Sequence, residues 1–323
     1  MIRQTAAVFL AAYAAVLSVV LGTLAMSLIA HLTTATWFRS FRPHARRVLR
    51  SLPVLAALGV IVLVAMPVLF PWFGAGSSAT DVGHYLNAPF FVVRFIIYWI
   101  AWLGIARALA ATDRLAESGD VERAAARYRN VAAAGLIVLG ITMTFAAFDW
   151  MMSLTPAWVS TIYGVYWFAG GMVGALALLG LLASRAETPA DDLDSLGKLL
   201  LTFILFWVYC GFAQYIVIWS GGLPREVDWY VVRTRGGWAG VATLLLFAGF
   251  AFPFLLLLMR ALRRSPAIIA GLGVLLLALH YLDTLWIVLP GVVAFTWWTF
   301  VLCALALGIA GAGTWVSFST RPS

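Results

Sequence analysis

Charged residues are scarce in this chain: they make up 11% of its 323 residues, whereas apolar residues make up 63% and the mean hydropathy is +0.98. In soluble globular domains about a quarter of the residues are charged. The composition therefore excludes a water-soluble enzyme or binding domain, and no polar segment is long enough to form one separately. We predict an all-α membrane protein in which residues 1–323 form one polytopic domain.

Cysteine and histidine are also rare, with two and four copies. Cys210 and Cys303 lie in apolar runs and are too few for an iron–sulfur cluster, and no Cys-x-x-Cys-His run for c-type haem is present. The histidines fall at different depths or in loops, so two imidazoles cannot face each other across a b-type haem. A glycine-rich phosphate loop and a nucleophile with a paired base are absent too. We expect no bound metal and no redox cofactor belonging to this chain.

Long apolar runs are what the chain does have. A hydrocarbon core of ~30 Å requires ~20 apolar residues per helix, and nine windows meet this requirement. The first is too long for the apolar part of a cleavable signal, so we predict a retained helix. The predicted spans are 5–31, 53–73, 89–110, 131–151, 161–184, 198–219, 239–261, 266–288 and 295–318.

The basic residues that give the net charge of +8 are distributed unevenly among the loops between the spans. If the nine spans alternate in direction, sixteen of the 21 basic residues fall on one side, including the clusters at 39–50 and 107–129. The positive-inside rule assigns that side to the cytoplasm. We predict an outer amino terminus, a cytoplasmic carboxyl terminus and a bacterial inner-membrane location, and this pattern explains the charge without a nucleic-acid partner.

Two loops stand out by their charged residues. Residues 111–130 are predicted as a cytoplasmic connector, with a short helix on the membrane surface as the alternative. Residues 220–238 are predicted as an outer loop rich in aromatic and charged residues. Such a loop can belong to an interfacial aromatic belt, cover an outer pocket, or dock a partner. The candidate docking residues are Glu226, Trp229, Tyr230 and Arg233.

The few polar groups within the spans gather toward the outer ends of the helices. With a rise of 1.5 Å per residue, several of them lie about 7–8 Å deep or within one turn of that depth. Charges in a membrane are costly and are therefore candidates for function. We expect an outer polar pocket, the alternative being an ion pair of Arg94 with Asp149 or Asp283 that only ties helices together. The group consists of Arg94, Asp149, Tyr166, Gln214, His280 and Asp283.

Several stretches resemble the ActF-type membrane subunit of alternative complex III, a relative of the NrfD-like proteins. The resemblance extends in order over nearly the whole chain, and its most specific parts are the Asp-Trp-Met-Met-Ser-Leu run and the segment from Gln-Tyr to Trp-Tyr. It rests on Leu21-Gly22, His31-Leu32-Thr33, Trp37, residues 85–91 with Arg94, residues 148–154 with Pro156, Trp158, Ser160-Thr161 and Gly164, Leu196-Gly197-Lys198, Phe206-Trp207, Tyr209, Gln214-Tyr215, Ile218-Trp219, Pro224, Glu226, Trp229-Tyr230, Arg233, Trp238, His280, Asp283, Trp286 and Pro290.

The resemblance implies a subunit of a quinol:electron-acceptor oxidoreductase built as two four-helix bundles plus extra spans. It further implies menaquinone or ubiquinone as the ligand, and three partners: an NrfD-like subunit, an iron–sulfur protein and a multihaem cytochrome c. The chain departs from the family pattern at His84, where a lysine is common, at Arg225-Glu226, where an acidic pair is common, and in lacking the usual first span.

We therefore expect a quinone-binding or non-catalytic subunit. The quinone-pocket candidates are Arg94, Tyr166, Gln214 and His84, and the proton-transfer candidates are Asp149, His280 and Asp283. No carboxylate lies deeper in the membrane, so an outer pocket is better supported than a proton pump. The alternative is an anchor for peripheral redox subunits that takes no part in quinone chemistry. A solute transporter would call for an internal repeat and a midplane site, and we find neither in the sequence.

Overall fold

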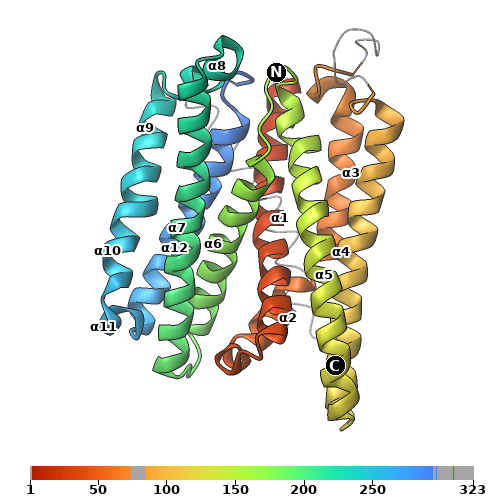
Figure 1. The fold of residues 1–323 in the computed structure, drawn as a ribbon, viewed down its shortest axis with the longest axis vertical. Helices are drawn as coiled ribbons and strands as arrows, with labels where there is room; N and C mark the ends of the chain where they lie inside the picture. The colour runs from red at the N-terminus through yellow and green to blue at the C-terminus, as the bar shows by residue number, and fades with distance from the viewer. Residues whose placement is uncertain (1, 74–83, 294–295, 297–307, 309–323) are drawn as a thin grey trace.

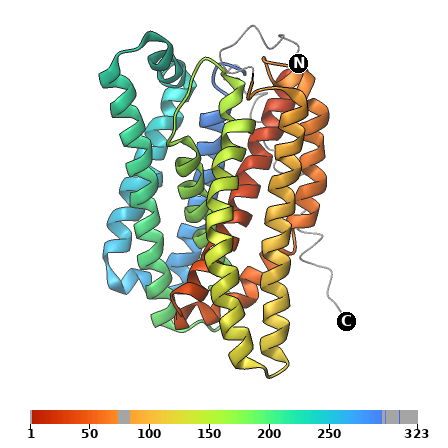
Figure 2. The same cartoon turned by 45° about the vertical axis from the view of Figure 1, so that its right-hand side comes forward.

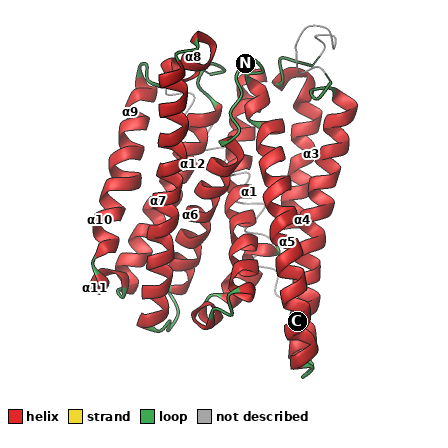
Figure 3. Cartoon of the chain, viewed as in Figure 1, coloured by secondary structure: helices red, strands yellow, loops and turns green. Residues whose placement is uncertain are grey.

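The computed structural model describes residues 2–73, 84–293, 296 and 308. Within these residues every regular element is a helix (Figure 3). The elements are α1 (Ile2–Leu32), η1 (Thr36–Ser40), α2 (Arg42–Leu49), α3 (Leu52–Leu69), α4 (Ala88–Glu117), α5 (Val121–Trp150), η2 (Met152–Leu154), α6 (Tyr163–Ala183), α7 (Ala190–Gly221), α8 (Pro224–Arg233), α9 (Gly237–Leu244), η3 (Leu245–Ala251), α10 (Phe252–Leu258), α11 (Arg260–Arg263) and α12 (Pro266–Val288).

Eight helical stretches in the described residues are long and apolar enough to cross a membrane. They coincide with the first eight predicted spans, while the ninth, 295–318, lies outside the described residues apart from isolated positions. The seventh span is continuous from α9 through the π-helical segment η3 to α10. The prediction of a multi-pass, all-α membrane protein is confirmed.

The eight spans lie side by side (Figure 1), and we divide them in chain order into two helix groups of four. The first helix group is α1, α3, α4 and α5, and the second is α6, α7, α9–α10 and α12. Helix α1 is central, because it packs on α6 and α12 as well as on α3 and α5. We call the end of the molecule with the amino terminus and α8 the α8 face, and the opposite end the α2 face.

Close packing of α1 on α6 joins the two groups. A Cβ atom on Gly22 would lie only 2.4 Å from the carbonyl oxygen of Gly171, and one on Gly171 would lie 2.6 Å from the carbonyl oxygen of Ser18. Small residues at helix contacts in membranes let backbones approach in this way. The glycines therefore determine the spacing between the helix groups.

The connector 111–130 is almost entirely helical. Helices α4 and α5 extend beyond the neighbouring helices (Figure 2) and meet in a turn where Gly119 has φ +93° and the Asp120 side chain caps α5. Asp113 of α4 accepts from Arg46 of α2 at 2.8 Å, which fixes this extension laterally. The separate surface helix considered from the sequence does not form, because α4 and α5 continue into the loop from both sides.

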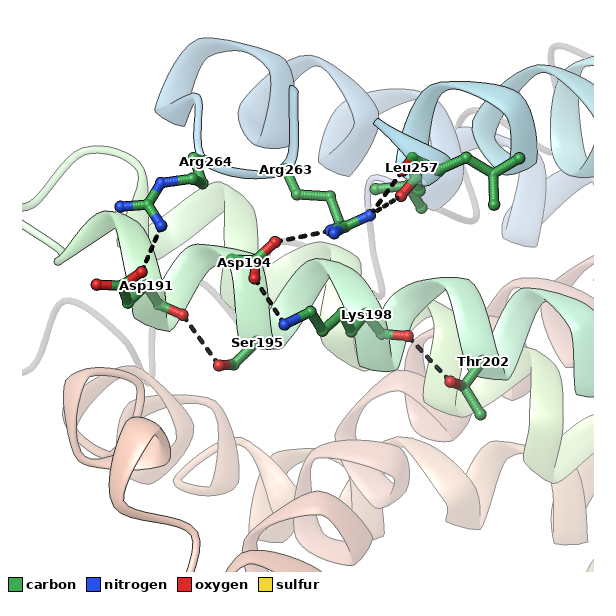
Figure 4. A network of polar contacts seen from close by, with 9 residues as sticks. Asp191, Asp194, Ser195, Lys198, Thr202, Leu257, Arg263 and Arg264 are labelled. Atoms are coloured by element: carbon green, nitrogen blue, oxygen red, sulfur yellow. Dashed lines mark hydrogen bonds and ion pairs between the residues drawn. The ribbon is translucent and has the colours of Figure 1, made fainter. Parts of the chain in front are cut away.

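An ionic cluster closes the second group at the α2 face (Figure 4). Asp194 of α7 binds Arg263 of α11 at 2.8 Å and Lys198 at 2.7 Å. Arg263 also donates to the carbonyl oxygen of Leu257 in α10 at 2.5 Å. The cluster thus ties the start of α7 to the end of the seventh span.

Candidate functional site

The polar groups expected to form one pocket separate into two clusters, one in each helix group. Arg94 and Asp149 lie between α4 and α5, whereas Tyr166 and Asp283 lie between α6 and α12. All four side chains are buried. Residues that were predicted to lie at the same depth in the membrane therefore belong to two separate sites.

Arg94 and Asp149 form a closed ion pair. The guanidinium donates from Nε to Oδ2 and from Nη2 to Oδ1, both at 2.8 Å, and Tyr98 donates to Oδ2 at 2.5 Å. The rings of Tyr85 and Phe90 lie 3.9 Å and 4.2 Å from the guanidinium carbon. Bidentate pairing of this kind satisfies the hydrogen-bonding groups of both partners. The cluster therefore holds α4 and α5 together.

Asp283 has a different environment. Its Oδ1 accepts from Tyr166 Oη at 2.5 Å and its Oδ2 accepts from Trp207 Nε1 at 3.2 Å. The side chain is 3% exposed, and within the described residues no arginine, lysine or histidine lies within ion-pair distance of it. Asp283 is thus a buried carboxyl group held only by neutral donors, as expected where a proton is taken up or released.

His280 lies one turn from Asp283 on α12 but points toward α1. Its Nε2 lies 2.8 Å from Ser18 Oγ, and that hydroxyl donates to the carbonyl oxygen of Ala15. Because a hydroxyl has one proton to donate, we assign Nε2 as the donor to Ser18. A Cβ atom on Gly170 would lie 3.2 Å from this ring, so a small residue on α6 makes the space for His280.

A cavity of about 450 Å³ lies beside Asp283. The two side chains that bind the Asp283 carboxyl group, Tyr166 and Trp207, form part of its wall. The exposed side chains of Phe212 and Leu246, on α7 and η3, lie at its rim. The lining residues are Tyr163, Tyr166, Trp207, Val208, Gly211, Phe212, Gln214, Tyr215, Trp229, Tyr230, Thr234, Ala242, Thr243, Leu245, Leu246, Trp286 and Ile287.

Gln214 and Tyr230 supply the polar wall of this cavity. Gln214 accepts from Ser160 Oγ and donates to Tyr230 Oη, each at 2.9 Å. Burial raises the pKa of Tyr230 to about 12, so its hydroxyl keeps its proton at neutral pH. Among the described residues this proton has no acceptor. Tyr230 can therefore donate a hydrogen bond to a ligand in the cavity.

Helix α8 covers the cavity with side chains that the sequence suggested for partner docking. Trp229, Tyr230 and Arg233 are buried within the chain itself, while Glu226 is half-buried. The Trp229 ring stacks on Trp158 at 4.3 Å, and the Arg233 guanidinium lies over Trp229 and donates to the carbonyl oxygen of Ile287 at 2.8 Å. These contacts fit the lid that was one alternative for residues 220–238.

The remaining candidate, His84, is exposed in the loop before α4 and does not line the cavity. Sequence reasoning missed Trp207 as a site residue, although it lies with Gly211 and Gln214 at the i, i+4, i+7 spacing of one helix face. Tyr98 was missed too, one turn from Arg94. In both cases helical spacing from a predicted site residue was the available signal.

In the described part of the chain no three histidine, cysteine or acidic residues come together as a metal site would require. No family model and no curated protein matches this chain. The function is therefore inferred from the geometry of the cavity and from the motifs quoted above.

Proposed function

We propose that this chain is a bacterial inner-membrane subunit of a quinol:electron-acceptor oxidoreductase of the alternative complex III type, and that it binds quinone in the cavity beside Asp283. The observation that carries the proposal is the contact of Asp283 with Tyr166 and Trp207, which themselves line the cavity. A volume of about 450 Å³ lies within the range of small-molecule sites. The aromatic walls suit a flat ring.

The polar groups suit the two ends of a quinone ring. Tyr230, fixed by Gln214, would donate to one ring oxygen. Tyr166 would take a proton from the opposite hydroxyl of a quinol while it passes its own proton to Asp283 at 2.5 Å. Oxidation of a quinol releases two protons and two electrons. Asp283 would hold one proton, the second would leave the other ring hydroxyl for water at the α8 face, and the two electrons would pass to the iron–sulfur clusters and haems that the resemblance assigns to partner subunits.

The π-helical segment η3 supports the same location. Leu245 and Leu246, at its start, line the cavity. Such segments are rare and occur often at functional sites. The wall next to Asp283 is thus the irregular part of the seventh span, while the Arg94 cluster lies between two regular helices.

Photoaffinity labelling of the assembled complex with an azidoquinone tests the proposal. We expect labelled peptides of this chain to map to α7, α8 and α9. A Thr243→Phe substitution, which fills the cavity from its exposed rim, should remove most of the label, whereas Val217→Phe, an exposed position of α7 outside the cavity, should leave it unchanged. Labelling confined to the partner subunits would overturn the proposal.

The second candidate function is an anchor for peripheral subunits. It is favoured by the exposed charged residues Arg225 and Asp228 of α8, which lie at the end of the molecule next to the half-buried Glu226. If the chain is only an anchor, replacing Arg225 and Asp228 by alanine should release the partners during purification, and the azidoquinone should not label this chain in the intact complex.

A further inference from the structure

A second cavity, of about 320 Å³, lies at the opposite end of the molecule from α8 and is lined by α1, η1, α2, α3 and α4. Five of its lining side chains are arginines and two are carboxylates, so three positive charges are unbalanced there. The proposed quinone site uses none of these groups. The arginines are Arg42, Arg46, Arg50, Arg107 and Arg114.

The arginines line the cavity from two helices, and three of them, Arg50, Arg107 and Arg114, are exposed. Arg42 and Arg46 are four residues apart on α2, and Arg50 follows after four more. Arg107 and Arg114, seven residues apart, share a face of α4. Two helices thus direct arginine side chains into the same space from two sides.

The two carboxylates leave most of this charge free. Asp113 and Glu117 both bind Arg46, at 2.8 Å and 2.7 Å. Arg42, Arg50, Arg107 and Arg114 make no ion pair with any described residue, and the buried Nε of Arg42 has no hydrogen-bond partner. Unpaired guanidinium groups around a cavity favour an anion with several acceptor oxygens.

The other wall of the cavity is apolar. Leu49, Leu52 and Pro53 lie where α2 passes into α3, and Leu103 faces them from α4. Beyond Leu103, one turn farther along α4, Ile100 is 67% exposed on the surface of the membrane span. A soluble anion gains no binding energy from such an apolar wall, whereas the acyl chains of a lipid can pack against it.

We propose that this cavity binds the phosphate head group of an anionic phospholipid. Arg50, Arg107 and Arg114 contact the phosphate oxygens, and the acyl chains lie along α3 and α4. Basic pockets between membrane helices recognise such head groups through this combination of charge and apolar surface. The bound lipid bridges α2 to α4 beside the Arg46–Asp113 pair.

Native mass spectrometry of the purified full-length chain tests the site, with added phosphatidylglycerol, cardiolipin or phosphatidylcholine as probes. We expect the two anionic lipids to remain bound and phosphatidylcholine to dissociate. Each arginine near an anionic lipid contributes ~1 kcal/mol, so Arg107→Gln combined with Arg114→Gln should weaken retention of anionic lipid at least about tenfold.

The matched control is Arg127→Gln with Arg129→Gln, which removes the same charge from exposed positions of α5 outside the cavity. Thermal unfolding of both variants without added lipid verifies that they are folded. Equal retention of phosphatidylcholine, or an equal loss of lipid in the control, would overturn the proposal. Displacement of the lipid by millimolar inorganic phosphate would also overturn it, because the site would then be one for a soluble anion.

Discussion

The two helix groups each bury one aspartate near the α8 face, and the two carboxyl groups have opposite surroundings. Asp149 receives two bonds from Arg94 and one from Tyr98. Asp283 receives one bond each from Tyr166 and Trp207. The first carboxylate has its charge balanced within the protein, while the second is bound by two residues of a cavity wall and has no cation beside it among the described residues.

An ionisable group at membrane depth is thus not by itself a functional site. Both aspartates are candidates for a functional role because a charge within a membrane costs free energy. The partner decides the outcome: a guanidinium in bidentate contact immobilises the charge, whereas neutral donors facing a cavity leave the carboxyl group able to exchange a proton. The first cluster therefore contributes to stability and the second is the candidate for chemistry.

Breaking the ion pair should have the largest effect on stability. Arg94→Gln leaves the Asp149 carboxylate buried without a cation, which costs about 3–5 kcal/mol of the free energy of unfolding. The measurement is unfolding of the purified chain in detergent. Adding Asp149→Asn to the same chain should recover much of the loss, since the unpaired charge is then removed. Equal stability of the single and double variants would contradict this role.

Separating the two helix groups should have the next largest effect. In Gly22→Ala the new methyl group would lie 2.4 Å from the Gly171 carbonyl oxygen, so α1 and α6 must move apart, at a cost of about 1–3 kcal/mol. Gly104→Ala is the control, because a Cβ atom there meets nothing within 4 Å. If both glycine variants unfold at the same temperature, the close contact does not determine the packing.

Asp283→Asn should cost only about 1 kcal/mol of stability, because the amide oxygen still accepts from Tyr166 while the amide nitrogen cannot accept from Trp207. Activity should respond more strongly than stability. In the assembled complex we expect quinol oxidation to fall at least about tenfold, since the neutral amide cannot take up a proton. Unchanged quinol oxidation in a complex of normal stability would remove Asp283 from the mechanism.

The smallest effect is expected from removing Lys198, the exposed one of the two cations that bind a third aspartate, Asp194. Lys198 has 62% of its side chain exposed and Arg263 has 11%. Lys198→Ala should therefore lower the free energy of unfolding by less than about 1 kcal/mol, while Arg263→Ala, measured in the same unfolding assay, should cost several times more. Similar losses would show that exposure does not distinguish the two partners.

The spans could be predicted because each depends on a local run of apolar residues. The pairing of Arg94 with Asp149 was one of two alternatives in the sequence, and Asp283 was the other partner. To choose between them, one must know how three helices are rotated about their own axes. A helix that is apolar on nearly all sides does not specify this rotation. The inward position of Trp229 and Arg233 was likewise decided by the docking of α8.

The sequence alone specified a multi-pass helical membrane protein with few polar groups in its spans, because water excludes such an apolar composition and its long apolar runs cross lipid as helices. The packing of the helices separated these groups into two sites and placed the two hydrogen-bond donors of Asp283, Tyr166 and Trp207, in the wall of a cavity. The physical reason is distance along the chain. Tyr166 and Asp283 are 117 residues apart, and Arg94 and Asp149 are 55 apart, so only the packing of helices makes them neighbours.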